Sequence, residues 1–218
     1  MNRSIAAGRA LVFAALLAAV AIAPARARAE EDATPAPIKL GTKVPQADVA
    51  LKNVDGKSLT LAGAAGKKGT LVLFICNHCP WVKAWQSRIA EVGNGALAKG
   101  IGVVAINSND PAAYPEDGFD EMVARAKEVG YKFAYAVDGT SGVAAAFGAT
   151  HTPEAFLFDA KGKLVYHGAV DDNAHEPGEV KAHWLADAVA SVAAGKPVRN
   201  AETKALGCGI KYREKSAD

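Results

Sequence analysis

A run of apolar residues that ends in two cysteines constrains the fold more than any other feature of the sequence. Residues 70–75 read Thr-Leu-Val-Leu-Phe-Ile, and they lead directly into Cys-Asn-His-Cys-Pro at residues 76–80. A short, uninterrupted apolar run is typical of a strand that is buried on both faces. From residue 82 to residue 96, apolar residues then recur three and four positions apart, which predicts an amphipathic helix. Proline is tolerated in the first turn of a helix, so the motif can stand at its start.

The rest of the chain continues as strands and helices. A second apolar run, 102–107, follows the helix, and strand–helix–strand units of this kind form right-handed parallel crossovers. Asp55-Gly56 and Lys161-Gly162 each separate two stretches of β character, so we expect hairpins there. Further helices are predicted at 119–129, 142–147 and 185–192, and a further strand at 133–137. The predicted fold class is α/β: a central mixed β-sheet flanked by helices, with an N-terminal β-hairpin extension.

The first 29 residues have the pattern of a secretory signal peptide. Arg3 and Arg9 precede an apolar run at 11–23, and small residues then occupy the positions that a signal peptidase reads, which predicts cleavage near Ala27 or Ala29. The apolar run is shorter than the ~20 residues that a transmembrane helix needs. We therefore expect a periplasmic or secreted protein with no membrane span after signal removal, in a compartment where disulfides persist.

Domain boundaries and charge follow from this signal peptide. After it we expect an extended leader at 30–47, one α/β domain at 48–198 and a C-terminal tail at 199–218. Four arginines and no acidic residues lie in 1–29, so the formal net charge changes from +2 to −2 when this segment is removed. Such a chain is not a strongly basic nucleic-acid binder, and we expect no nucleic-acid partner.

The two cysteines at the junction of a strand and a helix predict redox chemistry. Cys76 precedes the helix, where free N–H groups and the helix dipole favour a negative charge, so we expect a lowered pKa and a thiolate that attacks disulfides. Cys79 is expected to be the resolving thiol, and a protonated His78 between them favours the thiolate further. A stabilised thiolate makes the corresponding disulfide a better oxidant.

Two other roles for the cysteine pair remain open. A structural disulfide between them would close a very short loop and constrain little of the unfolded chain. A zinc site would need a second pair of ligands, and the sequence has no second Cys-x-x-Cys and no His-x-x-x-His. The redox-active pair is therefore the favoured interpretation.

Thr152-Pro153 is the second candidate element of the site. It stands just before the predicted strand at 155–159. The bond before Pro153 is either cis, which would place this loop beside the cysteines, or an ordinary trans bond. We assign Thr152 to the substrate groove together with Trp81, which directly follows the cysteine motif.

Together these motifs resemble those of thioredoxin-fold proteins of the redoxin (AhpC/TSA-like) group, in particular bacterial thioredoxin family proteins with a Cys-Asn-His-Cys-Pro centre. The resemblance covers nearly all of residues 44–212. The matching segments are 74–83, 106–110, 114–117, 152–159, 164–168 with 171–172, and 207–211. The resemblance implies a thioredoxin-like fold and a thiol–disulfide oxidoreductase with a general redox or antioxidant role, and it implies that Pro153 is a cis-proline that touches the substrate disulfide. The expected partners are thiols and disulfides of proteins or small molecules and an unidentified reductant or oxidant, with no cofactor.

Two departures from related families leave the proton transfer and the reaction open. Thioredoxins carry a buried acid on the strand before the cysteines, but residues 69–75 contain none, so proton transfer from Cys79 needs water or another group. A thiol peroxidase of the peroxiredoxin type is an alternative. Peroxiredoxins, however, have threonine at the position that Cys76 occupies relative to Cys79-Pro80, which weakens this alternative.

A copper-binding chaperone of the Sco type is the other alternative. His151 lies just before Thr152-Pro153 and resembles the copper-ligating histidine of those proteins, so Cys76, Cys79 and His151 form a candidate copper site. Sco-type proteins have one more residue between the two cysteines and lack the proline at position 153, which counts against this alternative.

Cys208 is left over once the other two cysteines are paired. It lies between two glycines in the predicted tail, where we expect flexible and exposed backbone. Three roles remain open for its thiol: to resolve a disulfide of Cys76, to bridge two subunits, or to stay free.

Overall fold

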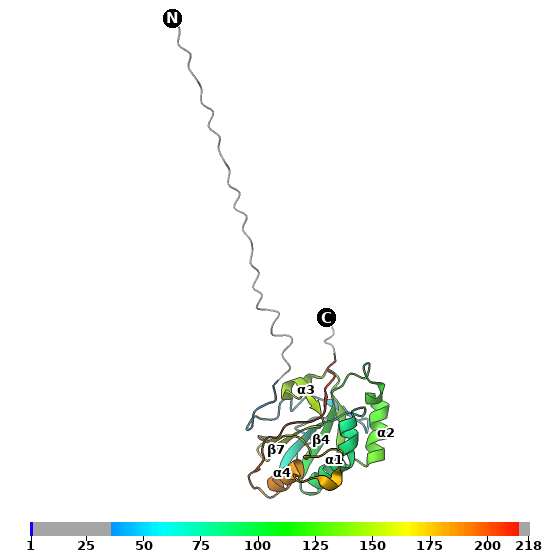
Figure 1. Cartoon of the computed structure of the whole chain (residues 1–218), viewed down its shortest axis with the longest axis vertical. Helices are drawn as coiled ribbons and strands as arrows, with labels where there is room; N and C mark the ends of the chain where they lie inside the picture. Colours follow the sequence, from blue (N-terminus) through cyan, green and yellow to red (C-terminus); the bar gives the residue numbers. More distant parts are fainter. Residues whose placement is uncertain (2–35, 214–218) are drawn as a thin grey trace. The chain divides into compact units, whose positions relative to one another are not determined.

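The computed structural model describes Met1 and residues 36–213 (Figure 1). The predicted signal peptide at 1–29, its cleavage site near Ala27 or Ala29, the first part of the leader and the last residues of the tail lie outside the described residues. Within the described part of the chain, no helix is long and apolar enough to cross a membrane.

A seven-stranded mixed sheet lies at the centre of the domain, in the order β2-β1-β5-β4-β3-β7-β8. Its middle strands, β3 (Gly69–Phe74) and β4 (Ile101–Asn107), are parallel and buried along their whole length. The other strands are β1 (Leu51–Asn53), β2 (Ser58–Leu59), β5 (Ala134–Val137), β7 (Glu154–Asp159) and β8 (Leu164–Gly168). β5 is parallel to β4, whereas the β1–β2 hairpin, β7 and β8 pair antiparallel. The predicted mixed sheet and N-terminal hairpin are therefore confirmed.

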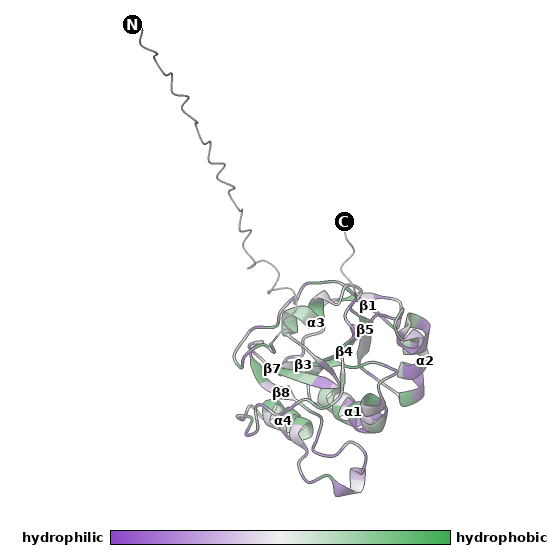
Figure 2. Cartoon of the chain, turned by 45° about the horizontal axis from the view of Figure 1, so that its top comes forward, coloured by the Kyte–Doolittle hydropathy of each residue, from purple (hydrophilic) through white to green (hydrophobic). Residues whose placement is uncertain are grey.

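Helices cover both faces of the sheet, because successive residues of a strand point to opposite sides. Leu71 and Leu73 of β3 contribute to the apolar cluster beneath three helices, whereas Val72 and Phe74 contribute to the cluster on the other face. The three helices are α1 (Pro80–Ala98), α2 (Phe119–Val129) and α4 (Trp184–Ala193), and the other face carries α3 (Gly142–Phe147). Coloured by hydropathy, the central strands are largely hydrophobic, while α2 shows much polar surface (Figure 2).

The α1 helix positions the cysteine motif. Its predicted apolar stripe is confirmed, because Val82, Trp85, Ile89 and Ala96 are buried. Cys79 is the N-cap residue, and Pro80 is the first residue of the helix. The motif therefore occupies the turn between the carboxyl end of β3 and the start of α1, where the first N–H groups of the helix have no partner within the helix.

A second, two-stranded sheet pairs the loop before β7 with the C-terminal segment. β6 (His151–Thr152) and β9 (Cys208–Gly209) are antiparallel, with Thr152 opposite Cys208. Cys208 is half-buried. The exposed position that its glycine neighbours suggested is therefore wrong, because a strand pairing between distant segments holds Cys208 against the domain.

Candidate active site

Both cysteines of the motif are free thiols, and they are almost completely buried, with 1% of Cys76 and 0% of Cys79 exposed. Thr152 contacts both of them. Its Oγ1 lies 3.3 Å from Cys76 Sγ, and its carbonyl oxygen, 3.1 Å from Cys79 Sγ, accepts a hydrogen bond from Cys79 when that thiol is protonated. The bond between Thr152 and Pro153 is cis. The structure therefore has the cis bond, which is the alternative that places this loop beside the cysteines.

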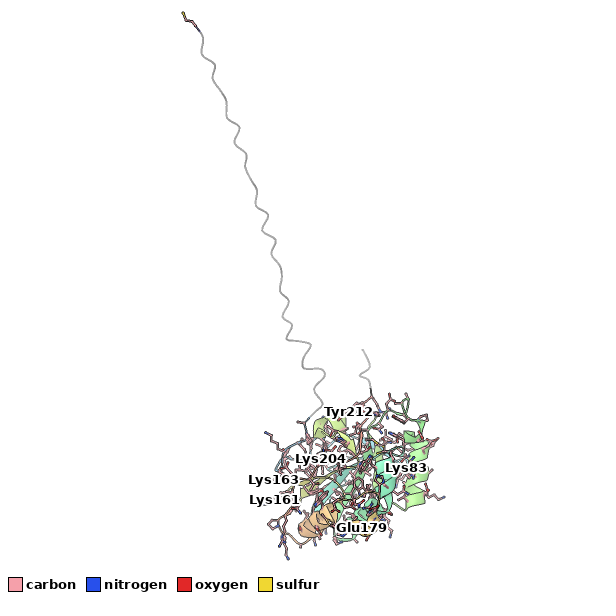
Figure 3. All side chains as sticks on the ribbon, viewed as in Figure 1. Lys83, Lys161, Lys163, Glu179, Lys204 and Tyr212 are labelled. Carbon is pink, nitrogen blue, oxygen red and sulfur yellow. The ribbon has the colours of Figure 1, made fainter. Side chains whose placement is uncertain are left out.

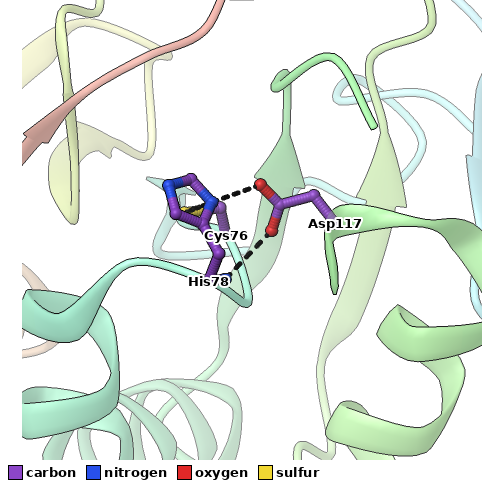
Figure 4. Close-up of side chains that lie close together, drawn as sticks. All are labelled: Cys76, His78 and Asp117. Atoms are coloured by element: carbon purple, nitrogen blue, oxygen red, sulfur yellow. Dashed lines mark hydrogen bonds and ion pairs between the residues drawn. The ribbon is translucent and has the colours of Figure 1, made fainter. Parts of the chain in front are cut away.

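A buried carboxylate, that of Asp117, organises the cysteine loop (Figure 4). Asp117 ends the short 3-10 helix η1 (Pro115–Asp117), just before α2. Its Oδ1 accepts the backbone N–H groups of Asn77 and His78, at 2.7 and 3.1 Å. Its Oδ2 lies 2.6 Å from His78 Nδ1 and accepts a hydrogen bond from Asn109 Nδ2 at 2.8 Å. Cys76 Sγ lies 3.6 Å from the same His78 nitrogen, so an acid, a histidine and a thiol are in contact.

Asp117 is the functional residue that sequence reasoning missed. The strand before the cysteines carries no acid, but η1 brings a carboxylate to the same loop from further along the chain. Asp117 lies in one of the segments that carry the family resemblance, but nothing in its spacing connects it to the cysteines. Its neighbour Tyr114 stacks on the His78 ring, with the ring centroids 3.8 Å apart.

The pKa values of the two cysteines shift in opposite directions. The pKa of Cys79 is lowered to about 4, first by a hydrogen bond from the Cys76 thiol, and then by the Cys208 thiol and by the N–H groups of Val82 and Cys208. The pKa of Cys76 is raised by its hydrogen bond to Cys79, by burial and by the Asp117 carboxylate. This direction is opposite to the lowered pKa that the sequence predicted for Cys76. Cys79 is the N-cap residue of α1, and its side chain makes no capping hydrogen bond there.

Comparisons with known proteins agree with this architecture. The model of the Redoxin family matches residues 39–183. The chain belongs to the Redoxin family. The crystal structure of an uncharacterized conserved protein from Geobacillus kaustophilus has 38% identity and a TM-score of 0.76, and the match covers 82% of this chain and 94% of that one. A hypothetical protein from Sinorhizobium meliloti 1021 has 38% identity and a TM-score of 0.74, over 83% and 98% of the two chains.

A more distant structure extends the Redoxin-family comparison at the level of the fold. The thioredoxin domain of a thiol-disulfide oxidoreductase from Bacteroides vulgatus has 19% identity and a TM-score of 0.50, over 60% of this chain and 88% of that one. No curated protein matches the chain in sequence. By family and fold, this Redoxin-family protein is a thioredoxin-like oxidoreductase.

A second buried acid of the Redoxin-family domain holds the loop that carries Thr152. Glu154 Oε2 accepts the N–H groups of Thr150 and His151, at 2.7 and 2.9 Å, and its Oε1 lies 2.6 Å from His167 Nε2. These bonds fix both ends of the short segment in front of β7. The cis bond and the Thr152 carbonyl are thereby held against the cysteines.

The remaining predicted residues lie around this centre. Trp81 is half-buried between the rings of Trp85 and His175, at centroid distances of 5.8 and 5.2 Å, and its place in a substrate groove stays a prediction. His151 pairs through Nδ1 with Thr150 Oγ1 at 2.7 Å.

Metal binding was the other chemistry considered for these cysteines. Among the described residues, the one group of three or more His, Cys, Asp or Glu side chains close enough to share a metal ion is Cys76, His78 and Asp117. His151 is not in this group. The copper set of Cys76, Cys79 and His151 therefore stays a hypothesis with no geometric support.

Proposed function

We propose that this Redoxin-family protein is an exported thiol–disulfide oxidoreductase whose redox-active pair is Cys76 and Cys79. The observation that carries the proposal is the pair of buried free thiols of Cys76 and Cys79 at the start of α1, both in contact with Thr152 of the cis bond. The thiolate is the species that attacks disulfides, and a lowered pKa maintains it at neutral pH. Export rests on the signal-peptide pattern of residues 1–29.

The proposed exchange takes two steps. The Cys79 thiolate attacks one sulfur of the substrate disulfide, forming a mixed disulfide and releasing one substrate thiolate. Cys76 then loses its proton and attacks Cys79 Sγ, so that the Cys76–Cys79 disulfide forms and the second substrate thiolate leaves. The leaving substrate thiolate takes up this proton, directly or through water, and the His78–Asp117 pair lies beside Cys76. In reverse, the same disulfide oxidises two thiols.

The environment of Cys76 supports this order of events. Its pKa is raised partly by the hydrogen bond and the negative charge of Cys79. Both causes disappear when Cys79 becomes part of a mixed disulfide, so Cys76 becomes a better nucleophile when it is needed. Stabilisation of the Cys79 thiolate favours the reduced protein, which predicts an oxidising disulfide. The proposed substrate groove is formed by Trp81, Thr152 and Pro153.

Insulin-disulfide reduction and a redox titration test this function. Wild-type protein is compared with Cys76→Ser and Cys79→Ser, and with Glu91→Gln as a control on the exposed face of α1. We expect no turnover from Cys79→Ser and strongly reduced turnover from Cys76→Ser, which lacks the second thiol of the pair. Undiminished turnover in either cysteine variant would remove the assignment.

A thiol peroxidase is the second candidate, and one observation favours it. Cys79 is a completely buried thiolate directly before Pro80, where a small oxidant such as a peroxide fits the closed surroundings better than a protein disulfide. The peroxide would oxidise Cys79 to a sulfenic acid, with which Cys76 condenses to a disulfide and water. Peroxide consumption in the presence of a thiol reductant, measured with the same variants, tests the peroxidase function. Consumption that does not depend on Cys79 excludes a peroxidase that works through this residue.

A further inference from the structure

We call the C-terminal segment 206–213 the strap. Strand pairing and hydrogen bonds hold it beside the cysteine pair. It contains β9, which pairs with β6 and so places Cys208 opposite Thr152. Further hydrogen bonds run from Ile210 N–H to Thr150 O, from Lys211 N–H to Asn109 Oδ1 and from the Tyr212 hydroxyl to Ala149 O, with Tyr212 labelled in Figure 3. Asn109 also donates to Asp117, so one side chain links the strap to the cysteine loop.

Gly207 allows the strap to approach the Thr152 carbonyl closely. A Cβ atom at this position would lie 2.1 Å from Thr152 O and 3.2 Å from Pro153 N, so a side chain does not fit. The same carbonyl oxygen is 3.1 Å from Cys79 Sγ. Cys208, the residue after Gly207, therefore lies near Cys79.

Cys208 lies beside Cys79. Its thiol and its backbone N–H are among the groups that lower the pKa of Cys79. Its side chain also packs against the apolar cluster that contains Cys76 and Cys79. Cys79 therefore lies between two thiols, one from its own loop and one from the strap, and the thiol from the strap is the most exposed of the three.

We propose that Cys208 is a second resolving thiol, which forms a disulfide with Cys79 in competition with Cys76. This inference rests on the proposed thiol exchange at Cys79. Once Cys79 holds a mixed disulfide with the substrate, Cys208 loses its proton and attacks Cys79 Sγ. The bond between Cys79 and the substrate sulfur breaks, and the substrate leaves as a thiolate that takes up a proton. The product is a Cys79–Cys208 disulfide, and the substrate has received two electrons.

The same chemistry moves the disulfide within the site. Attack of Cys76 on Cys79 Sγ converts Cys79–Cys208 into Cys76–Cys79 and returns Cys208 to the thiol. Because Cys208 is half-buried whereas the other two thiols are covered, the Cys79–Cys208 form is the one that an external thiol reaches more easily. The strap thereby provides a route between the buried pair and the solvent.

The electrostatics of Cys208 agree with a role after the first attack. Its pKa is raised to about 11, first by burial and then by its hydrogen bond to Cys79 and the negative charge there. The causes that involve Cys79 vanish when that thiolate is consumed in a mixed disulfide. The pKa of Cys208 therefore falls, and its reactivity increases, once Cys79 has reacted, while the effect of burial stays.

Disulfide mapping in the absence of Cys76 tests the proposal. Reduced Cys76→Ser and reduced Cys76→Ser/Cys208→Ser are treated with oxidised glutathione, quenched in acid, alkylated and analysed by intact mass and peptide mapping. We expect Cys76→Ser to lose its glutathione adduct and to form an intrachain Cys79–Cys208 disulfide. The double variant should retain glutathione on Cys79. Persistent glutathione on Cys79 of Cys76→Ser, with Cys208 still a free thiol, would overturn the proposal.

Partly oxidised wild-type protein provides a second measurement that needs no substitution. We expect its peptide map to contain both the Cys76–Cys79 and the Cys79–Cys208 disulfide, and a map with the first alone counts against the inference. The insulin assay separates this outcome from the underlying function. Insulin turnover without any Cys79–Cys208 disulfide overturns the inference alone, whereas a Cys79 that accepts no glutathione in any variant overturns the thiol exchange and the inference with it.

Discussion

Cys76 and Cys79 are the same residue type, three positions apart and equally buried, but their acid strengths shift in opposite directions. The pKa of Cys79 is lowered by the thiols of Cys76 and Cys208 and by the backbone N–H groups of Val82 and Cys208. Cys76 faces the Asp117 carboxylate, and Thr152 is the group beside it that lowers its pKa. The comparison shows that burial does not decide which thiol ionises. The supply of hydrogen-bond donors and the sign of the nearest charge decide it.

The largest expected effect is that Cys79→Ser loses the thiolate at neutral pH, whereas Cys76→Ser keeps it. At neutral pH we expect thiolate absorbance in the ultraviolet from reduced wild-type protein and from Cys76→Ser, where the serine hydroxyl still donates. Cys79→Ser should show none below about pH 8, because ordinary cysteine has a pKa near 8.5. The measurement is a pH titration of this absorbance. A thiolate that persists in Cys79→Ser and disappears in Cys76→Ser would reverse the comparison.

The pH dependence of stability is a further test of the difference between Cys76 and Cys79. The pKa of Cys79 is about 4 in the folded reduced protein and near 8.5 in the unfolded chain, so between these values the unfolded state binds more protons. The stabilisation is fully present above about pH 8.5 and is lost as the pH falls toward about 4. The free energy of unfolding should rise with pH in this window by up to about 1.4 kcal/mol per unit.

Denaturant unfolding of the reduced protein across this range measures the slope. The control is Cys79→Ser, from which this contribution to the slope should be absent. Equal slopes for the two proteins would show that Cys79 ionises in the same way in the folded and the unfolded states.

A smaller effect is expected from the charge next to Cys76. Asp117→Asn removes a negative charge that raises the pKa of Cys76, so this pKa should fall. The measurement is made in a Cys79→Ser background, where Cys76 is the thiol of the pair that titrates. Glu154→Gln is the matched control, because it alters another buried acid, which contacts the loop of Thr152 and not Cys76. An equal pKa shift in both variants would mean that the Asp117 charge has no specific effect on Cys76.

Local patterns in the sequence predicted most of the fold. The spacing of Val82, Trp85 and Ile89 predicted α1, and the apolar run before the cysteines predicted β3, because burial on a helix or strand leaves a periodic trace. The location of the redox pair followed from the same two elements. The ionisation of this pair did not follow, because the pKa of each thiol depends on groups that come from other parts of the chain.

The role of Asp117 and the contacts of Cys208, which was named only as a possible resolving thiol, could not be predicted from the sequence. Asp117 arrives on η1, which follows β4, and Cys208 arrives on β9 after the last helix. Neither residue has a spacing that relates it to Cys76 or Cys79. Their contacts exist because the sheet order and the β6–β9 pairing bring distant segments to one end of the sheet.

By itself, the sequence determined that a strand leads through two cysteines into a helix, and that the fold is mixed α/β. Only the tertiary structure decided which cysteine carries the charge, which acid serves the loop and what Cys208 contacts. The physical reason is the range of the forces involved. Apolar periodicity records the burial of each element separately, whereas a pKa is set by donors and charges within a few ångströms, whatever their distance along the chain.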